Sequence, residues 1–324
     1  MGNKLKRPCG PPCGKGIGGQ AVIEGVMMKG RTEYVLAVRD IEKKNIKIEK
    51  TKTKTPEERN VILRLPLVRG VVAFVDSLII GMKTITRSAQ MAGLEDMDDD
   101  INEEEMSKFE KWLMDKLGDK LMNIVLAISV IISLVFSVAL FMVLPVLVSS
   151  FFNKFLGLGT WALGIIEGFT RICIFLFYIC LTSLLKDIKR LYKYHGAEHK
   201  TINCFESGEE LTVENVRQYT RLHKRCGTSF LFLVMIISMI VFLFLRTDVV
   251  IYRILSRIIF VPVVAGLSYE VIRWAGKNDN IFVDIVSAPG KAVQLITTKE
   301  PDDEMIEVAI ASLKGVLEDE PEQK

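Results

Sequence analysis

The chain has 324 residues, of which 49% are hydrophobic and 25% charged, with a formal net charge of +3 and a mean hydropathy of +0.29. Because so many charges lower the mean hydropathy, the positive value requires apolar residues to be concentrated in long segments. This composition excludes a disordered chain, a collagen-like chain, a disulfide-rich secreted module and a repeat solenoid. The small net charge, without interleaved aromatic and basic residues, also argues against nucleic-acid binding.

The first sixty residues divide into a tail and a small β unit. Residues 1–15 contain the sequence CGPPCG and are predicted to form a disordered tail. The alternative, a metal knuckle at Cys9 and Cys13, would need a second ligand pair nearby, and none follows. Residues 16–60 predict a β unit, in which YVLAVRD and NIKIEKT form two strands around a polar turn at 42–45. The glycines of GGQAVIEGVMMKG do not have the spacing of a dinucleotide-binding or P-loop motif.

Two further segments precede the longest apolar run. Residues 61–92 are apolar, but four charged residues interrupt the part from 61 to 86, which favours a helix that lies on the membrane or re-enters it over a complete span. Residues 93–120 contain the acidic run EDMDDDINEEE and predict an acidic linker followed by an amphipathic helix. Repulsion between its carboxylates favours a solvated linker over the alternative of divalent-cation binding.

Four apolar segments are candidates to cross a membrane. About 20 apolar residues suffice to span a bilayer core. The candidate spans are residues 121–148, 161–185, 230–245 and 258–274, which group into two hairpins over 121–185 and 229–276. We therefore expect a mainly α polytopic membrane protein with about four transmembrane helices, a small cytoplasmic β unit and amphipathic cytoplasmic helices.

The distribution of basic residues predicts the orientation of these spans. Nine lysines and arginines lie in the connection 186–228, whereas Lys154 is the only one between the first two spans. Because short cytoplasmic loops carry the excess of positive charge, we expect this connection and both termini to lie in the cytoplasm. The chain is thus predicted to be a multi-pass protein of the cytoplasmic membrane, with the lipid bilayer as its first partner and no cleaved signal peptide.

The cytoplasmic C-terminal segment, residues 277–324, contains a predicted helix over 302–317 that begins next to Pro301. One stripe of this helix is apolar and comprises Met305, Val308, Ala309 and Leu313. We expect this stripe to dock on the other cytoplasmic parts of the chain.

All three histidines of the chain lie in the connection 186–228. His195, Glu198 and His199 form an HxxEH motif, whose positions i, i+3 and i+4 share one face of a helix. Two imidazoles one turn apart can hold a divalent metal, most typically zinc, beside a carboxylate that serves as general base. This order is that of the inverzincins, so Glu198 is the candidate catalytic residue. The alternative is a solvated amphipathic turn.

A metal site of this kind needs further ligands. A predicted helix from Thr212 to Gly227 places His223 on its inward face, which makes His223 the candidate third ligand, although a core histidine would occupy the same face. Additional candidate ligands lie elsewhere in the chain, namely Glu206, Cys226, Glu270 and Glu24. The structural alternative for Glu270 is an ion pair with Arg273, three residues later.

Several segments together resemble the YqhQ-type family of bacterial membrane proteins. They are GGQAVIEGVMMKG, LPLVRGVV, DSLIIGMKTITRSAQ, YHGAEHKTINCFESGEELT, HKRCGTSFL and APGKAVQLITTKEPDDEMIEVAI. The family is a domain of unknown function described as predicted metal-dependent enzymes of the bacterial inner membrane. The resemblance implies a polytopic membrane protein with a metal role for His195, Glu198, His199 and His223, and it implies no particular reaction.

Three hypotheses follow for the function. The first is a zinc-dependent, peptidase-like hydrolase that acts on a peptide or a membrane protein at the cytoplasmic membrane surface. The second is a non-catalytic, metal-stabilised membrane scaffold or assembly factor. The third is a transporter with Glu167, Arg171 and Glu270 along its path, although Glu167 and Arg171, at i and i+4, are also expected to neutralise each other. Four spans without inverted repeats would require a homo-oligomer to build a carrier.

Overall fold

The computed structural model describes residues 17–53, 55, 58, 60–94, 119–224, 226–245, 249–275, 278 and 281–318. The predicted tail at 1–15 and most of the predicted segment 93–120 lie outside these residues. The described residues belong to two compact units, which we call the sheet unit and the helical unit. The sheet unit comprises Met1–Leu94, Leu176–Ser238 and Val261–Lys324, and the helical unit comprises Glu95–Phe175 and Met239–Phe260.

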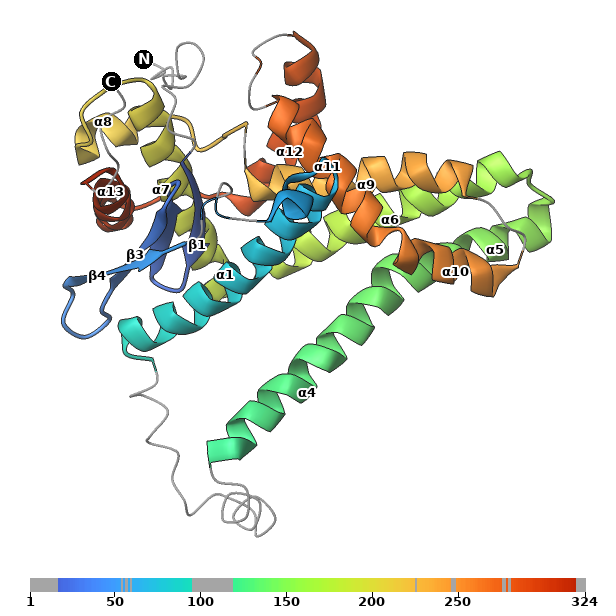
Figure 1. The fold of residues 1–324 in the computed structure, drawn as a ribbon, viewed down its shortest axis with the longest axis horizontal. Coiled ribbons are helices and arrows are strands. Elements are labelled where there is room, and N and C mark those ends of the chain that lie inside the picture. Colours follow the sequence, from blue (N-terminus) through green and yellow to red (C-terminus); the bar gives the residue numbers. More distant parts are fainter. Residues whose placement is uncertain are drawn as a thin grey trace. The chain divides into compact units, whose positions relative to one another are not determined.

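The sheet unit contains one antiparallel sheet of four strands in the order β1-β2-β3-β4 (Figure 1). The strands are β1 (Gly18–Val22), β2 (Gly25–Lys29), β3 (Glu33–Arg39) and β4 (Ile46–Lys52). The two strands expected from YVLAVRD and NIKIEKT are β3 and β4, paired from Glu33↔Lys52 to Arg39↔Ile46. The glycine-rich segment before them forms two additional strands, which period-two alternation did not indicate because both faces of β2 are buried.

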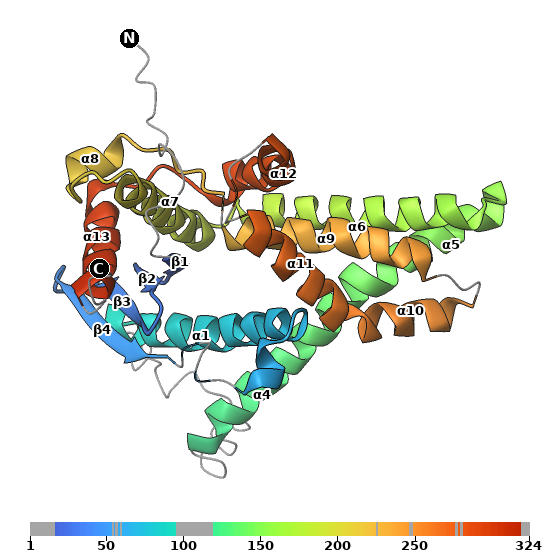
Figure 2. The ribbon, with the colours of Figure 1, turned by 45° about the horizontal axis from the view of Figure 1, so that its top comes forward.

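Helices cover both faces of this sheet, as Figure 2 shows for α1 and α7. On one face Val26, Met28 and Val35 share a core with α7 (Lys186–Glu206) and α13 (Asp303–Glu318). On the other face a second core joins Val22, Met27, Leu36 and Val38 to Met91 and Ala92 of α1 (Val68–Ala92). All four side chains of the predicted C-terminal stripe are buried in the first core. The sheet thereby fixes α7, which carries the HxxEH motif.

Three helical segments are long and apolar enough to cross a membrane, or up to four if one bent pair counts as a single span. They are Ile128–Leu156, Trp161–Thr182 and Gly227–Phe244, and the bent pair is Val250–Ile259 with Val261–Ala275. The corresponding elements are α4 (Asp119–Val138), η4 (Ala139–Val143), α5 (Leu144–Leu156), α6 (Thr160–Thr182), α9 (Gly227–Phe244), α10 (Val250–Ile259) and α11 (Val261–Ala275). Membrane-length helices were expected from the apolar segments, and the structure confirms their helical conformation.

The first and fourth predicted spans differ most in extent from the structure, whereas the second and third agree with it to within three residues at each end. The first continues to Leu156, beyond the expected end at residue 148, because Pro145 occupies the first turn of α5, where its missing N–H costs little. The fourth begins at Val250 and is broken near Phe260, whereas one segment from residue 258 was expected.

The segment 61–92 forms a short 3-10 helix, η2 (Val61–Arg64), followed by α1. Large apolar side chains on both are exposed, including Val61, Ile62, Leu78, Ile79 and Met82. The helix α12 (Ile281–Thr297) likewise exposes Ile281, Phe282 and Ile285. Such apolar faces on charged helices are typical of segments that contact a membrane surface.

Candidate metal centre

Helix α7 presents the HxxEH motif toward the interior of the sheet unit. Glu198 and His199 are buried, and His195 is partly buried. The helix is held by a close backbone approach at Gly196, where an added Cβ would lie 2.0 Å from the carbonyl oxygen of Lys299. The amide of Lys299 in turn donates to the carbonyl of Tyr192 at 2.8 Å. The glycine between the two motif halves is therefore a packing requirement.

The predicted helix from Thr212 to Gly227 is wrong. Thr212 does cap a helix, since its hydroxyl accepts a hydrogen bond from the amide of Asn215 at 3.3 Å, but this helix, α8 (Val213–Arg217), has only five residues. The following backbone is irregular because α7 side chains engage its carbonyl groups. Asn203 Nδ2 donates to the carbonyls of Thr220 and Leu222, at 2.7 and 3.1 Å.

Two further α7 side chains bind the same irregular segment. Lys200 Nζ donates to the carbonyl of Arg217 at 3.0 Å, and His199 Nδ1 donates to the carbonyl of Arg221 at 2.6 Å. These bonds fix the backbone of residues 217–222 along α7, and Cys226 follows shortly after, immediately before α9. The thiol is thereby brought above the two histidines of the motif.

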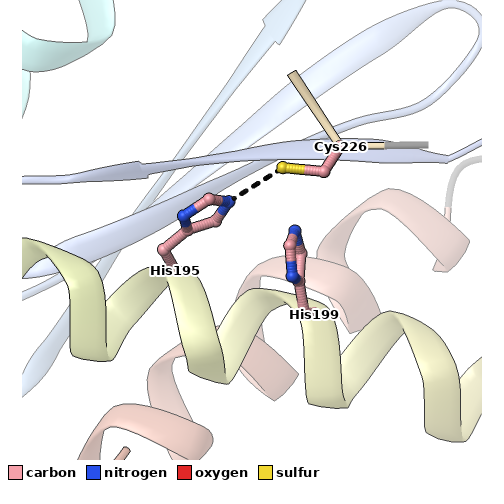
Figure 3. Close-up of side chains that lie close together, drawn as sticks. All are labelled: His195, His199 and Cys226. Carbon is pink, nitrogen blue, oxygen red and sulfur yellow. Dashed lines mark hydrogen bonds between the residues drawn. The ribbon is translucent and has the colours of Figure 1, made fainter. Parts of the chain in front are cut away.

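His195, His199 and Cys226 converge, as Figure 3 shows. Each offers one ligand atom, and the three atoms lie within 4.8 Å of one another. The two imidazole centroids are 4.4 Å apart, and Cys226 Sγ lies 3.3 Å from His195 Nε2. Two imidazoles and a thiolate form a donor set that zinc prefers.

The hydrogen bonds from the two imidazoles to backbone carbonyls use Nδ1 and leave Nε2 of each ring inside the sheet unit, where His195 Nε2 faces Cys226 Sγ. His195 Nδ1 lies 2.9 Å from the carbonyl oxygen of Thr297, and His199 Nδ1 bonds the carbonyl of Arg221. A carbonyl can only accept, so each neutral ring carries its hydrogen on Nδ1 and a lone pair on Nε2. His199 Nε2 is buried and has no hydrogen-bond partner. Backbone carbonyls orient metal-binding histidines in the same way.

The surroundings of Cys226 favour its thiolate form. Burial raises the pKa of the thiol, but the imidazoles of His199 and His195 outweigh it and hold this pKa well below its usual range. The amide of Thr228 points to Sγ at 3.4 Å, and the Thr228 hydroxyl lies 2.8 Å from Sγ, both in the first turn of α9. Burial lowers the pKa of His195, yet Cys226 and Glu198 raise it overall to about 9.

Glu198 lies beside the three ligands. Its side chain is buried, its Oε2 has no hydrogen-bond partner, and burial raises the pKa of its carboxyl group although His195 and His199 oppose that rise. On its other side it packs against β1, where an added Cβ on Gly19 would lie 2.7 Å from Oε1. An unsatisfied carboxylate oxygen and an unsatisfied imidazole nitrogen in one buried cluster fit a cation.

His223 and Glu206 lie near this cluster but outside the three-ligand group. The His223 ring centroid is 5.7 Å from that of His199, and its Nε2 is 3.4 Å from Glu206 Oε2. Burial lowers the pKa of His223 to about 4, so the ring is neutral. Its backbone is clamped by Gln294 of α12, which accepts from the His223 amide and donates to the His223 carbonyl, both at 2.8 Å.

The remaining two candidate ligands have other partners. Glu24, in a left-handed conformation between β1 and β2, forms a two-pronged ion pair with Arg190 of α7 and accepts from the hydroxyl of Tyr194 at 3.2 Å. Glu270 forms its ion pair with Arg69 of α1, and Arg273, the partner considered as the alternative to a ligand role, acts on it only through its charge. Arg69 and Glu270 are 201 positions apart in the sequence, so the spacing of residues along one helix could not predict their contact.

We expect the substitution Gly19→Ala to displace the Glu198 carboxylate without unfolding the chain, since the conflict falls on a flexible side chain. In cobalt-loaded protein the visible absorption bands should shift, while the amount of bound cobalt stays the same. Gly18→Ala is the matched control, because nothing lies within 4 Å of a Cβ there. Identical spectra for the two variants would contradict this placement of Glu198.

The fold and site define a largely helical protein with several membrane-length apolar helices and a buried His-His-Cys cluster beside a carboxylate. Residues 65–319 match the family described as "Protein of unknown function (DUF1385)", and the chain belongs to this family. The chain is also 37% identical over 301 residues to "Uncharacterized protein YqhQ" of Bacillus subtilis (strain 168), covering 93% of this chain and 92% of that protein. The resemblance found in the sequence motifs is thus confirmed. No solved structure matches the chain.

Proposed function

We propose that the chain is a multi-pass protein of the bacterial cytoplasmic membrane that binds zinc through His195, His199 and Cys226 and acts as a metal-dependent hydrolase. One observation carries this proposal: one ring nitrogen from each of the two imidazoles and the Cys226 sulfur lie within 4.8 Å of one another. Both Nδ1 atoms are engaged by backbone carbonyls, so Nε2 is the nitrogen that each ring would offer to a metal. His199 Nε2 has no other partner, and a metal would displace the proton that His195 Nε2 shares with Cys226.

The membrane-length helices and the basic connection between the second and third of them support the placement in the membrane. Cys226 directly precedes α9, which is one of these helices. With both termini in the cytoplasm, the site lies at the cytoplasmic membrane surface. It can there meet a peptide or a segment of a membrane protein, which we propose as the substrate class.

The described residues offer three ligands in this cluster, which supports catalysis over a purely structural role. Structural zinc sites close with four ligands, whereas catalytic sites leave one position open. Zinc, when bound, supplies the Lewis acidity that polarises a carbonyl group. Glu198 would take a proton from the attacking water and return it to the leaving group. Its position beside His195, His199 and Cys226 supports this role.

Elemental analysis of the purified chain tests the metal site. We expect about one zinc per chain, and less than a tenth of that in His195→Ala, His199→Ala and Cys226→Ala, because each removes one of three ligands. His223→Ala is the matched control and should keep its zinc. A folded chain without bound metal would overturn the proposal. If Cys226 of such a metal-free chain reacts readily with an alkylating reagent, the Cys226–His195 pair would instead support a reactive thiol.

The variant Glu198→Gln separates hydrolysis from the alternatives. It keeps the shape of the side chain and removes its basicity, so zinc should remain bound while complementation of a deletion strain fails. Complementation by Glu198→Gln, together with failure of the ligand variants, would instead support a metal-stabilised scaffold or assembly factor. If His195→Ala, His199→Ala and Cys226→Ala also complement the deletion strain, the function does not need the metal site, and the transporter hypothesis would remain.

A further inference from the structure

The helical unit buries four charged side chains in one cluster, which lies outside the metal centre. Glu167 and Arg171 belong to α6, and Arg253 and Arg257 belong to α10. None of the four is more than 8% exposed. The sequence indicated a pair of Glu167 with Arg171, and the structure adds two guanidinium groups to it.

The acceptor capacity of the Glu167 carboxylate is fully used. Arg257 donates from Nε to Oε1 at 2.8 Å and from Nη2 to Oε2 at 3.1 Å. Arg253 Nη2 donates to Oε2 at 3.0 Å, and Arg171 Nη2 donates to Oε1 at 3.2 Å. Four donors match the roughly four lone-pair positions of a carboxylate. Glu167 therefore orients all three guanidinium groups.

The charges of this cluster do not balance. Three guanidinium groups face one carboxylate, so the cluster carries three positive charges against one negative, a net charge of +2. Among the side chains of the helical unit that the structure describes, Glu167 is the only acidic one. A buried excess of charge among apolar helices is costly unless an anion compensates it.

Neutral groups complete part of the cluster. Arg171 Nε donates to the carbonyl of Phe141 at 2.9 Å. Pro145, four residues later, has no N–H to donate to that carbonyl. The guanidinium of Arg257 lies 4.5 Å from the centroid of the Phe242 ring. These contacts hold the arginines in place and leave their charge unchanged.

Arg253 has N–H donors that the cluster does not use. Its Nε makes no hydrogen bond to any described residue, and its Nη1 has one long bond, 3.4 Å to the hydroxyl of Ser150. The side chains around it on α10 are apolar and exposed, with Ile251 at 56%, Tyr252 at 61% and Leu255 at 44%. Arg253 thus joins the buried positive cluster to an apolar outer surface.

We propose that this cluster binds the phosphate of an anionic lipid through Arg253, with the acyl chains against the exposed apolar face of α10. Guanidinium groups bind phosphate oxygens in a two-pronged fashion, and a phosphodiester supplies negative charge where the cluster lacks it. The apolar surface on both sides of Arg253 favours a lipid over free phosphate. The inference depends on the membrane placement proposed above and is independent of the metal centre.

The test measures thermal unfolding of the full chain in neutral detergent, with and without dioleoylphosphatidylglycerol. We expect saturable stabilisation by this lipid, none by dioleoylglycerol, which lacks the phosphate, and little by inorganic phosphate. Arg253→Gln should weaken lipid binding about tenfold, since Glu167 keeps its two bonds from Arg257 and the fold is retained. Lys154→Gln, at an exposed lysine of the same unit, is the matched control.

Equal stabilisation by inorganic phosphate would overturn the lipid as the source, and equal stabilisation by dioleoylglycerol would overturn the phosphate contact. If the Arg253→Gln chain unfolds at a lower temperature but is stabilised by the lipid as much as the parent chain, the cluster stabilises the fold and does not bind the lipid. If Arg253→Gln does not fold, native mass spectrometry of the parent chain decides: retained phosphatidylglycerol supports the proposal, and its loss on exchange into detergent contradicts it. Zinc content is measured on the same samples, so failure of either proposal is seen separately.

Discussion

Gly196→Ala should destabilise the sheet unit by at least about 3 kcal/mol and abolish metal binding. The added methyl group would lie 2.0 Å from the backbone oxygen of Lys299, and 3.4 Å from Pro301. Because a backbone atom is involved, no side-chain rotation can relieve this overlap. Helix α7 would have to move away from the connection between α12 and α13, which would also break the hydrogen bond from His195 to the carbonyl of Thr297.

Thermal unfolding of the detergent-solubilised chain and its zinc content are the measurements for this prediction. Gly159→Ala is the control, because nothing lies within 4 Å of a Cβ at that position. An unfolding temperature for Gly196→Ala within one or two degrees of the parent, with zinc retained, would show that the approach of α7 to Lys299 is not as close as the structure has it.

Gln294→Leu has the second largest expected effect. The Gln294 amide is fully buried and bonds the amide and carbonyl of His223 and the hydroxyl of Ser229, each at 2.8 Å. Leucine preserves the volume and removes all three hydrogen bonds, at a cost of about 2–4 kcal/mol. Cys226 lies between the two clamped residues, so zinc affinity should also fall about 10–100-fold, as when other supporting groups of metal ligands are removed.

Competition with a chelator of known affinity measures this loss, alongside the unfolding temperature. Leu295→Ala changes the next residue of α12, whose side chain is exposed, and should leave zinc affinity unchanged. A Gln294→Leu chain that is destabilised but binds zinc as tightly as the parent would show that the clamp stabilises the fold without positioning Cys226.

Local patterns predicted the elements of this molecule and the part of the site that one helix carries. The spacing of His195, Glu198 and His199 sufficed to place them on one face of α7, because helical geometry alone sets their neighbours. The apolar stripe of α13 was likewise visible as a 3.6-residue period. Both features depend on contacts between residues close in sequence.

The remainder of the site depends on contacts that no local pattern encodes. Cys226 takes the place predicted for His223 because α7 side chains bind the carbonyls of residues 217–222 and prevent the helix that would have turned His223 inward. The carbonyl of Thr297, which orients His195, lies 102 positions away and has no side-chain signature at all. For Cys226 the sequence offered its sulfur, which made it an additional candidate ligand, and its position just before an apolar helix.

X-ray absorption at the zinc edge of the purified chain tests the metal centre most directly. The proposed site predicts one sulfur at about 2.3 Å and two imidazole nitrogens at about 2.0–2.1 Å, with the sulfur shell absent in Cys226→Ser. A zinc spectrum with only nitrogen and oxygen neighbours, or one that Cys226→Ser leaves unchanged, would contradict the assignment of His195, His199 and Cys226 as the ligands.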